Sequence, residues 1–117
     1  MTITLFGIPN CDTVKKARVW LGEQQQDFVF HDFKKQGLDR ATVEEWLKHL
    51  KWDVLVNRKG TTWRGLPDAR KAAIVDDASA AELMLEYPSI VKRPVLQHAG
   101  QFHLGFSADQ YAQIFHR

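Results

Sequence analysis

The residue best suited to chemistry in this chain is Cys11, its single cysteine. It follows the turn-forming stretch Ile8-Pro9-Asn10, where an apolar run ends and a helical pattern begins. A thiol at the first turn of a helix lies near unpaired N–H groups and the positive end of the helix dipole, which favour the thiolate. Because the thiolate is the reactive form, Cys11 is a candidate nucleophile. The alternative is a small buried apolar residue, which is common for a free cysteine.

The histidines give a weaker signal than the cysteine. We expect His98 and His103, which flank a predicted hairpin, to face solvent. The spacing of the five histidines relative to Cys11 does not fit a metal-ligand pattern, so we expect no zinc site. They are His31, His49, His98, His103 and His116.

The first third of the chain has the pattern strand, helix, strand. Residues 2–7 form a short β-prone run, and apolar residues recur at helical spacing from position 14 to position 21. Asn10 or Asp12 is the expected cap of this helix. Residues 28–33 alternate phenylalanine with polar residues and predict a second strand, parallel to the first because a helix joins them.

The middle of the chain reads as helical. Thr42 with Glu45 and Ser79 with Glu82 have the spacing of capping boxes, each followed by apolar residues. The second of these helices should end near Tyr87, because a proline follows. Between the two helices we expect a surface loop.

The last quarter of the chain predicts a hairpin followed by a helix. Residues 95–97 and 102–105 read as two strands, and Ser107 with Gln110 has capping-box spacing before the final helix. The surface loop expected between the two helices in the middle of the chain covers residues 57–67, which are rich in turn formers and basic side chains.

The order of these elements predicts the fold class. Strand, helix, strand, then helices, then two strands and a helix is the order of an α/β thioredoxin-like fold with a mixed four-stranded sheet. We expect one domain over residues 1–117, with a helical insertion at about 40–88.

Composition limits the function further. The 117 residues are 44% hydrophobic and 26% charged with a net charge of +2, which is ordinary for a folded monomer and argues against nucleic-acid binding. The chain has no apolar stretch of the roughly 18 residues that suggest a membrane span, and its start does not resemble a signal peptide. One cysteine cannot form an internal disulfide. We therefore expect a cytoplasmic protein.

Four ordered stretches resemble the arsenate reductase (ArsC) family, and its YffB-like branch in particular. They are GIPNCDT at 7–13, NRKGTTW at 57–63, KRPV at 92–95 and LGFS at 104–107. The resemblance covers nearly the whole chain. It implies a thioredoxin-like fold with an added helical part, no tightly bound cofactor, and use of glutathione or glutaredoxin in place of a second internal cysteine.

The resemblance also assigns roles to residues. It implies that Cys11 is the nucleophile and that Arg58 and Arg93 are catalytic arginines, although a single arginine is more often a solvated surface group. Two guanidinium groups would stabilise a thiolate and bind an anion. Pro94 matches a proline that is usually cis beside the thiol. The implied substrate-binding residues are Asn10, Asp12, Thr13, Arg58, Arg93 and Pro94.

One departure from the family pattern lowers the expectation for arsenate. Phe106 takes the place of a third arginine in arsenate reductases of this type. Losing one of three cationic groups should weaken binding of a doubly charged oxyanion. The resemblance therefore implies a glutathione-dependent thiol/disulfide reductase that uses Cys11 on an unidentified oxidised substrate and acts poorly on arsenate.

A second interpretation comes from regulators in the same family. Spx-type proteins bind RNA polymerase, and many carry a Cys-x-x-Cys redox switch at the first turn of the helix. In this chain the second cysteine of that motif is replaced by Val14. A regulator of this type would have to work without an internal disulfide.

Overall fold

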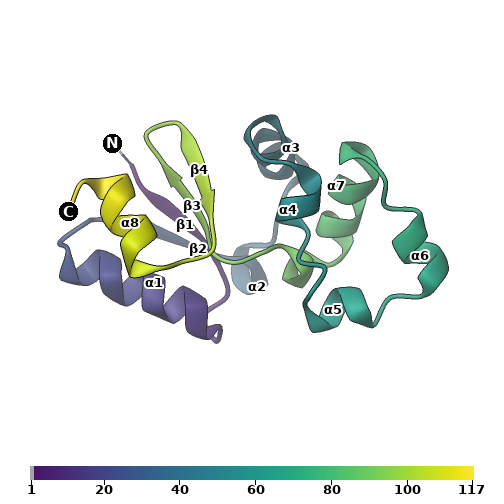
Figure 1. Cartoon of the computed structure of the whole chain (residues 1–117), viewed down its shortest axis with the longest axis horizontal. Coiled ribbons are helices and arrows are strands. Elements are labelled where there is room, and N and C mark those ends of the chain that lie inside the picture. The colour runs from purple at the N-terminus through teal and green to yellow at the C-terminus, as the bar shows by residue number, and fades with distance from the viewer. Residues whose placement is uncertain (1) are drawn as a thin grey trace. The chain divides into compact units, whose positions relative to one another are not determined.

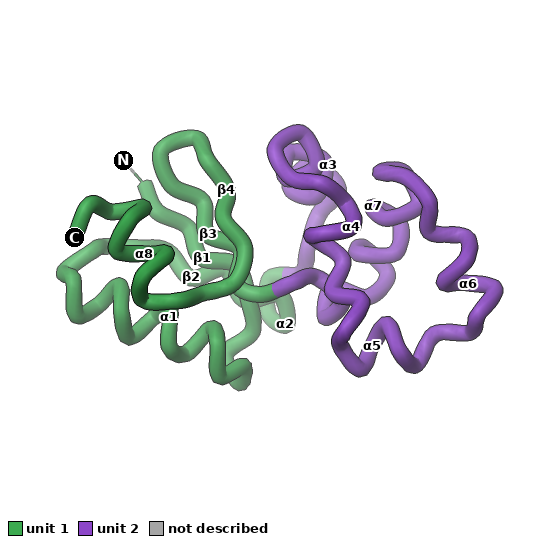
Figure 2. Tube along the Cα trace, viewed as in Figure 1, with its two compact units in different colours: residues 1–36, 93–117 green, residues 37–92 purple. Residues whose placement is uncertain are grey.

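A computed structural model describes residues 2–117 as two compact units (Figure 2). Unit 1 contains the described residues up to Gln36 together with Arg93–Arg117, so the two ends of the chain fold together. Unit 2 is the intervening segment Gly37–Lys92. It contains the residues for which the sequence predicts a helical insertion.

Unit 1 carries the predicted strand-helix-strand and strand-strand-helix halves (Figure 1). The order confirms the thioredoxin-like class, with strand limits shifted by one or two residues from those expected. The elements are β1 (Thr4–Gly7), α1 (Asp12–Glu23), β2 (Val29–Asp32), α2 (Phe33–Gln36), β3 (Val95–His98), β4 (Gln101–Leu104) and α8 (Ala108–Phe115).

The four strands form one mixed sheet in the order β2-β1-β3-β4. β1 and β2 are parallel, and Gly7 lies opposite Asp32 at their carboxyl ends. β3 runs antiparallel to both β1 and β4. The β3–β4 turn has positive φ angles at both central residues, 54° at Ala99 and 75° at Gly100, as a type I′ hairpin turn requires.

The core of unit 1 lies between the sheet and two helices. Leu5 of β1 and Leu96 of β3 share a buried cluster with Leu21 of α1 and Tyr111 of α8. Because side chains alternate along a strand, α1 and α8 therefore cover the same face of the sheet. Aromatic rings also pack between these helices: the Trp20 ring contacts the Tyr111 ring edge to face, with 5.6 Å between the ring centroids.

Unit 2 is built from helices and one isolated bridge between Val56 and Val91. Trp46 of α3 and Leu83 of α7 are fully buried. No helix within residues 2–117 is long and apolar enough to cross a membrane. The elements are α3 (Arg40–His49), α4 (Trp52–Leu55), α5 (Thr61–Arg64), α6 (Asp68–Ala72), α7 (Asp77–Glu86) and η1 (Pro88–Ile90).

Three predicted helix starts differ in the structure. Helix α3 is capped by Asp39, which accepts from the Thr42 N–H, so Thr42 lies inside the helix. Helix α7 has a capping box formed by Asp76 and Ser79, three residues before the predicted start. In both cases an aspartate precedes the predicted cap by three residues and takes its role, because its carboxylate accepts from the backbone N–H of the residue predicted to be the cap.

The third difference concerns α1, whose N-cap is Cys11 itself and which has no side-chain cap hydrogen bond. Neither Asn10 nor Asp12 caps this helix, contrary to expectation. At the other end of the chain the predicted cap is confirmed: Ser107 accepts from the Gln110 N–H and starts α8. Gln110 does not complete a box, because its side chain donates to the Leu104 carbonyl.

The segment expected as a surface loop over 57–67 contains a helical turn. Helix α5 begins after Gly60, which has an extended backbone, and the Arg64 N–H donates to the Gly60 carbonyl at 3.1 Å. The Thr62 hydroxyl also pairs with the Ser89 hydroxyl at 3.0 Å. These contacts hold in place a stretch whose composition alone suggests an irregular loop.

The position of α1 depends on a close approach at Gly7. Gly7 is buried at the end of β1, and a Cβ built there would lie 2.8 Å from a methyl of Val14. Val14 is fully buried and β-branched, so its methyl has little freedom to move aside. The first turn of α1 therefore packs on the strand end only because residue 7 has no side chain.

We predict that Gly7→Ala lowers the free energy of unfolding by about 1–3 kcal/mol, the usual cost of overpacking. The matched control is Gly22→Ala in the same helix, because a Cβ at Gly22 meets no atom within 4 Å. Gly22→Ala should raise the free energy of unfolding by about 0.5–1 kcal/mol. Urea unfolding followed by circular dichroism measures both, and equal effects would contradict the close approach.

Candidate functional site

Cys11 lies at the N-cap position of α1, directly before the first helical residue. Its backbone is extended, with φ −104° and ψ 125°, and its carbonyl accepts the first intrahelical hydrogen bond from Lys15 at 2.9 Å. The N–H groups of residues 12–14 precede that bond and belong to the open end of the helix. The thiol is half-buried, so Cys11 is not the fully buried core residue of the alternative interpretation.

The other predicted binding residues of this stretch are the sequence neighbours of Cys11. Asn10 and Asp12 are exposed, and Thr13 is half-buried in the first turn of α1. Asp12 places a carboxylate at the positive end of the helix, which stabilises the helix but opposes negative charge on Cys11. Lys15 and Lys16, about one turn further along the helix, are exposed.

Arg93 and Pro94 lie at the same end of the sheet as the loop that carries Cys11. Phe6 of β1 pairs with Val95 of β3, so Pro94 immediately precedes the strand opposite the carboxyl end of β1. The predicted cis geometry of the Arg93–Pro94 bond is confirmed. Pro94 is buried, its carbonyl accepts from the Gly105 N–H at 2.9 Å, and Arg93 is half-buried. Direct contact between Pro94 and Cys11 stays a prediction.

Arg58 lies in unit 2, on the turn after α4. The Asn57 side chain accepts from the Lys59 N–H at 3.2 Å and orders this turn. The exposed Arg58 guanidinium lies over the indole of Trp52, 5.9 Å from the ring centroid. Cys11 and Arg93 thus share unit 1, whereas the approach of Arg58 to the thiol stays a prediction.

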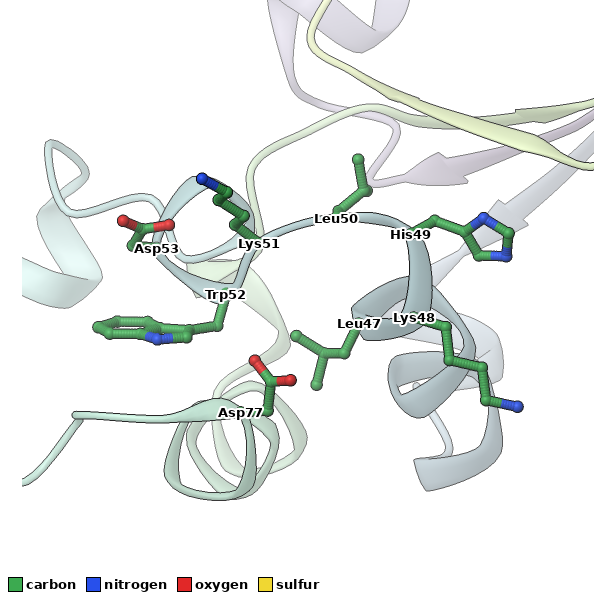
Figure 3. Close-up of a pocket in the computed structure, with 8 residues that line it drawn as sticks. All are labelled: Leu47, Lys48, His49, Leu50, Lys51, Trp52, Asp53 and Asp77. Carbon is green, nitrogen blue, oxygen red and sulfur yellow. The ribbon is translucent and has the colours of Figure 1, made fainter.

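A pocket of about 410 Å³ in unit 2 opens beside the same tryptophan (Figure 3). In this view the Trp52 ring extends to one side, whereas Lys48 and His49 extend to the other. The lining mixes two carboxylates with two lysines, so its charge does not favour one sign of ligand. The pocket has no feature that points to redox or nucleophilic chemistry.

Asp32 is a residue at this end of the sheet that the sequence pattern does not single out. It is 7% exposed, pairs in register with Gly7, and accepts from the Lys34 N–H at 2.8 Å. Its carboxylate thereby starts α2 at the carboxyl end of β2. Asp32 falls inside the strand predicted over residues 28–33, so the sequence pattern carried no signal for this role.

Phe106, at the apparent position of the third arginine, is part of the unit 1 core. Its ring meets that of Tyr111 edge to face at 4.7 Å and packs against the buried cluster. This position therefore contributes to packing, and the described structure gives it no role in binding an anion.

The two histidines of the β3–β4 hairpin are His98 and His103. His98 and His103 are half-buried and line a pocket of unit 1, so they are only partly exposed to solvent. His98, at the end of β3, packs on the ring of Phe115, at the end of α8, with 4.6 Å between the ring centroids. Within residues 2–117 no group of three histidine, cysteine or acidic side chains is arranged to hold a metal ion.

The fold and the half-buried thiol at a helix start define a thioredoxin-like protein with a single cysteine, and comparisons with known proteins narrow this class. The model of the ArsC family matches residues 6–114, so the chain belongs to the ArsC family. An arsenate reductase (ArsC) related protein from Brucella melitensis is 51% identical, with a TM-score of 0.78 over 98% of this chain and 95% of that structure. A protein named YffB is 47% identical, with a TM-score of 0.90 over 95% and 96%.

More distant relatives include transcription regulators. The global transcriptional regulator Spx of Streptococcus pneumoniae is 27% identical over 113 residues, which cover 92% of this chain and 81% of that protein. An uncharacterised protein of Haemophilus influenzae is 38% identical over 97% of this chain and 98% of its own length. The predicted family and its YffB-like branch are thus confirmed, together with a distant relation to Spx.

We predict that Cys11→Ser leaves the fold intact and raises the free energy of unfolding by up to about 1 kcal/mol, because serine is a preferred N-cap and the cysteine makes no cap hydrogen bond. Cys11→Ala, which lacks the cap oxygen, is the control and should give no such gain. Urea unfolding measures both. A loss of stability in Cys11→Ser would mean that the thiol serves packing.

Proposed function

We propose that this protein is a glutathione-dependent thiol/disulfide reductase in which Cys11 is the only redox-active protein residue. The observation that carries the proposal is the half-buried thiol at the open N-terminus of α1 in a chain of the ArsC family. The helix end favours the thiolate electrostatically, and the thiolate is the form that attacks oxidised sulfur.

The proposed reaction has three thiol exchanges. The Cys11 thiolate attacks one sulfur of a substrate disulfide, forming a mixed disulfide and releasing the other sulfur as a thiolate. A glutathione thiolate then attacks the Cys11 sulfur, leaving Cys11 bound to glutathione and releasing the second substrate thiol. A second glutathione restores the Cys11 thiolate and leaves as glutathione disulfide, so two glutathione molecules supply the two electrons.

Arg93 and Arg58 have separate proposed roles. Arg93, at the same end of the sheet as Cys11, would bind a carboxylate of glutathione or stabilise the thiolate. Arg58, exposed above Trp52, would bind the anionic substrate or leaving group. Asn10, Asp12 and Thr13 would contact the incoming peptide near the thiol, and glutaredoxin is an alternative donor of the resolving thiol.

We predict that the protein reduces a mixed disulfide between glutathione and a cysteine peptide, in an assay coupled to glutathione reductase. Arg93→Ala should raise the KM for glutathione about tenfold or more, since a charged hydrogen bond contributes on the order of 1.5–3 kcal/mol. The matched control is Arg18→Ala, because Arg18 is an exposed arginine of α1 that stacks on Phe30 at 4.3 Å. Arg18→Ala should leave the KM unchanged.

Mass spectrometry completes this test. After incubation with oxidised glutathione, intact protein should carry one glutathione on Cys11, and reduced glutathione should remove it. If the adduct does not form, or forms but never turns over, the proposed reductase activity is wrong.

We further propose that arsenate is a poor substrate and that a restored arginine has a structural cost. Phe106→Arg should lower the free energy of unfolding by about 2 kcal/mol or more, because it removes an aromatic ring packed on Tyr111. Urea unfolding measures that cost, and an arsenate reduction assay with glutathione measures activity. Reduction of arsenate by the unmodified protein at typical enzyme rates, roughly 1–1000 per second, would contradict the proposal.

The Spx relatives support a second candidate, a regulator that binds RNA polymerase. The position of the second switch cysteine is Val14, which is fully buried against Gly7. A regulator with this sequence would therefore act without an internal disulfide. Capture of RNA polymerase by the purified protein, together with no turnover of glutathione, would favour this function over the reductase.

A further inference from the structure

A pocket of about 550 Å³ opens at the end of unit 1, where the β3–β4 hairpin and the end of α8 come together. We call it the hairpin pocket. His98 and His103 line it from the hairpin, and Phe115 and Arg117 from the end of α8. Strand register explains the first pair: His103 lies opposite Leu96, whose side chain is in the cluster beneath α8, and His98 is two residues further along the same strand.

The hairpin pocket lies at the opposite end of the sheet from Cys11. Gln97 pairs with Thr4 at the start of β1, whereas the Cys11 loop follows Gly7 at the end of β1. The pocket is therefore separate from the candidate redox site, and the proposed function does not use it.

The charged side chains that line the hairpin pocket have one sign. Its titratable or charged side chains are His98, His103, His116 and Arg117, and none of the described lining residues is acidic. Burial lowers the pKa of His103, and the nearby His98 lowers it further. Protonating His103 without a counter-ion is thus unfavourable, and a bound anion would remove that penalty.

His98 presents a defined donor. Its Nδ1 is buried and has no hydrogen-bond partner among residues 2–117. An unpaired buried acceptor is better tolerated than an unpaired buried N–H, which favours the proton on Nε2. The ring is held against Phe115, so Nε2–H is the group with which His98 can bind a ligand.

The end of α8 supplies the cation. His116 has a left-handed backbone, with φ 58°, and the Arg117 N–H donates to the Ala112 carbonyl at 2.8 Å. These bonds close the helix and hold the backbone of Arg117 beside the pocket. Ile114 and Phe115 add an apolar wall next to this charge.

We propose that the hairpin pocket is a second ligand site, which binds a small organic anion with a flat apolar body, such as an aromatic carboxylate. The Arg117 guanidinium pairs with the carboxylate, His98 and His103 donate hydrogen bonds to it, and the ring of the ligand packs on Ile114 and Phe115. An inorganic anion would leave the apolar wall unused, and a neutral aromatic compound would leave the cationic groups unpaired.

Isothermal titration of the full chain with 2-naphthoate tests this proposal. We expect saturable one-to-one binding that is at least about fivefold tighter near pH 6 than near pH 8, because the anion favours a protonated His103. His103→Gln should abolish most of this pH dependence. Arg117→Gln, at an exposed residue, should weaken binding at least about fivefold at both pH values.

Two controls separate the proposal from simpler explanations. The neutral analogue 2-naphthamide should bind at least about tenfold more weakly than 2-naphthoate. His49→Gln, at an exposed histidine of unit 2, and Cys11→Ser should bind 2-naphthoate like the unmodified protein. Absent saturable binding, equal affinity for the amide, or unchanged affinity in both Arg117→Gln and His103→Gln would overturn the proposal, and none of these outcomes bears on the reductase activity.

Discussion

The contact between Gly7 and Val14 is the constraint on which the candidate redox site depends. It lets the first turn of α1 lie directly on the end of β1, so that Cys11 becomes the N-cap of the helix with its thiol half-buried. A side chain at position 7 would push the helix start away from the sheet. The same contact explains why position 14 is an apolar residue in this chain, since Val14 is fully enclosed there.

The two ends of the sheet in unit 1 carry different side chains. Because β1 and β3 are antiparallel, the end of β1 lies beside the start of β3 and the start of β1 lies beside the end of β3. The end that carries Cys11 also carries Arg93, Pro94 and the buried Asp32, whose carboxylate is used by the backbone of α2. The opposite end carries histidines and a cation beside aromatic rings. These two groups of side chains thus lie at opposite ends of the same sheet.

Family membership and physical reasoning contribute different parts of the functional argument. The match over residues 6–114 shows the ArsC family, and Spx regulators are distant relatives of this chain. The helix end at Cys11 favours redox chemistry of sulfur, and the buried Val14 excludes an internal disulfide at that position. Phe106 belongs to the core of unit 1, where its ring packs on Tyr111.

The sequence by itself determined the order of the elements, the strand-helix-strand start, the hairpin and the place of Cys11 at a helix start, because these follow from local periodicity, turn residues and proline positions. It misplaced the starts of α3 and α7, since several polar residues near each start compete to cap the helix and only the packed helix selects one. It also assigned His98 and His103 to solvent. Only the tertiary structure decided that His98 packs on Phe115 of α8, because residues 98 and 115 are brought together by folding and share no local pattern. For the same reason the close approach of Gly7 to Val14 and the packing of Phe106 on Tyr111 became visible only in three dimensions.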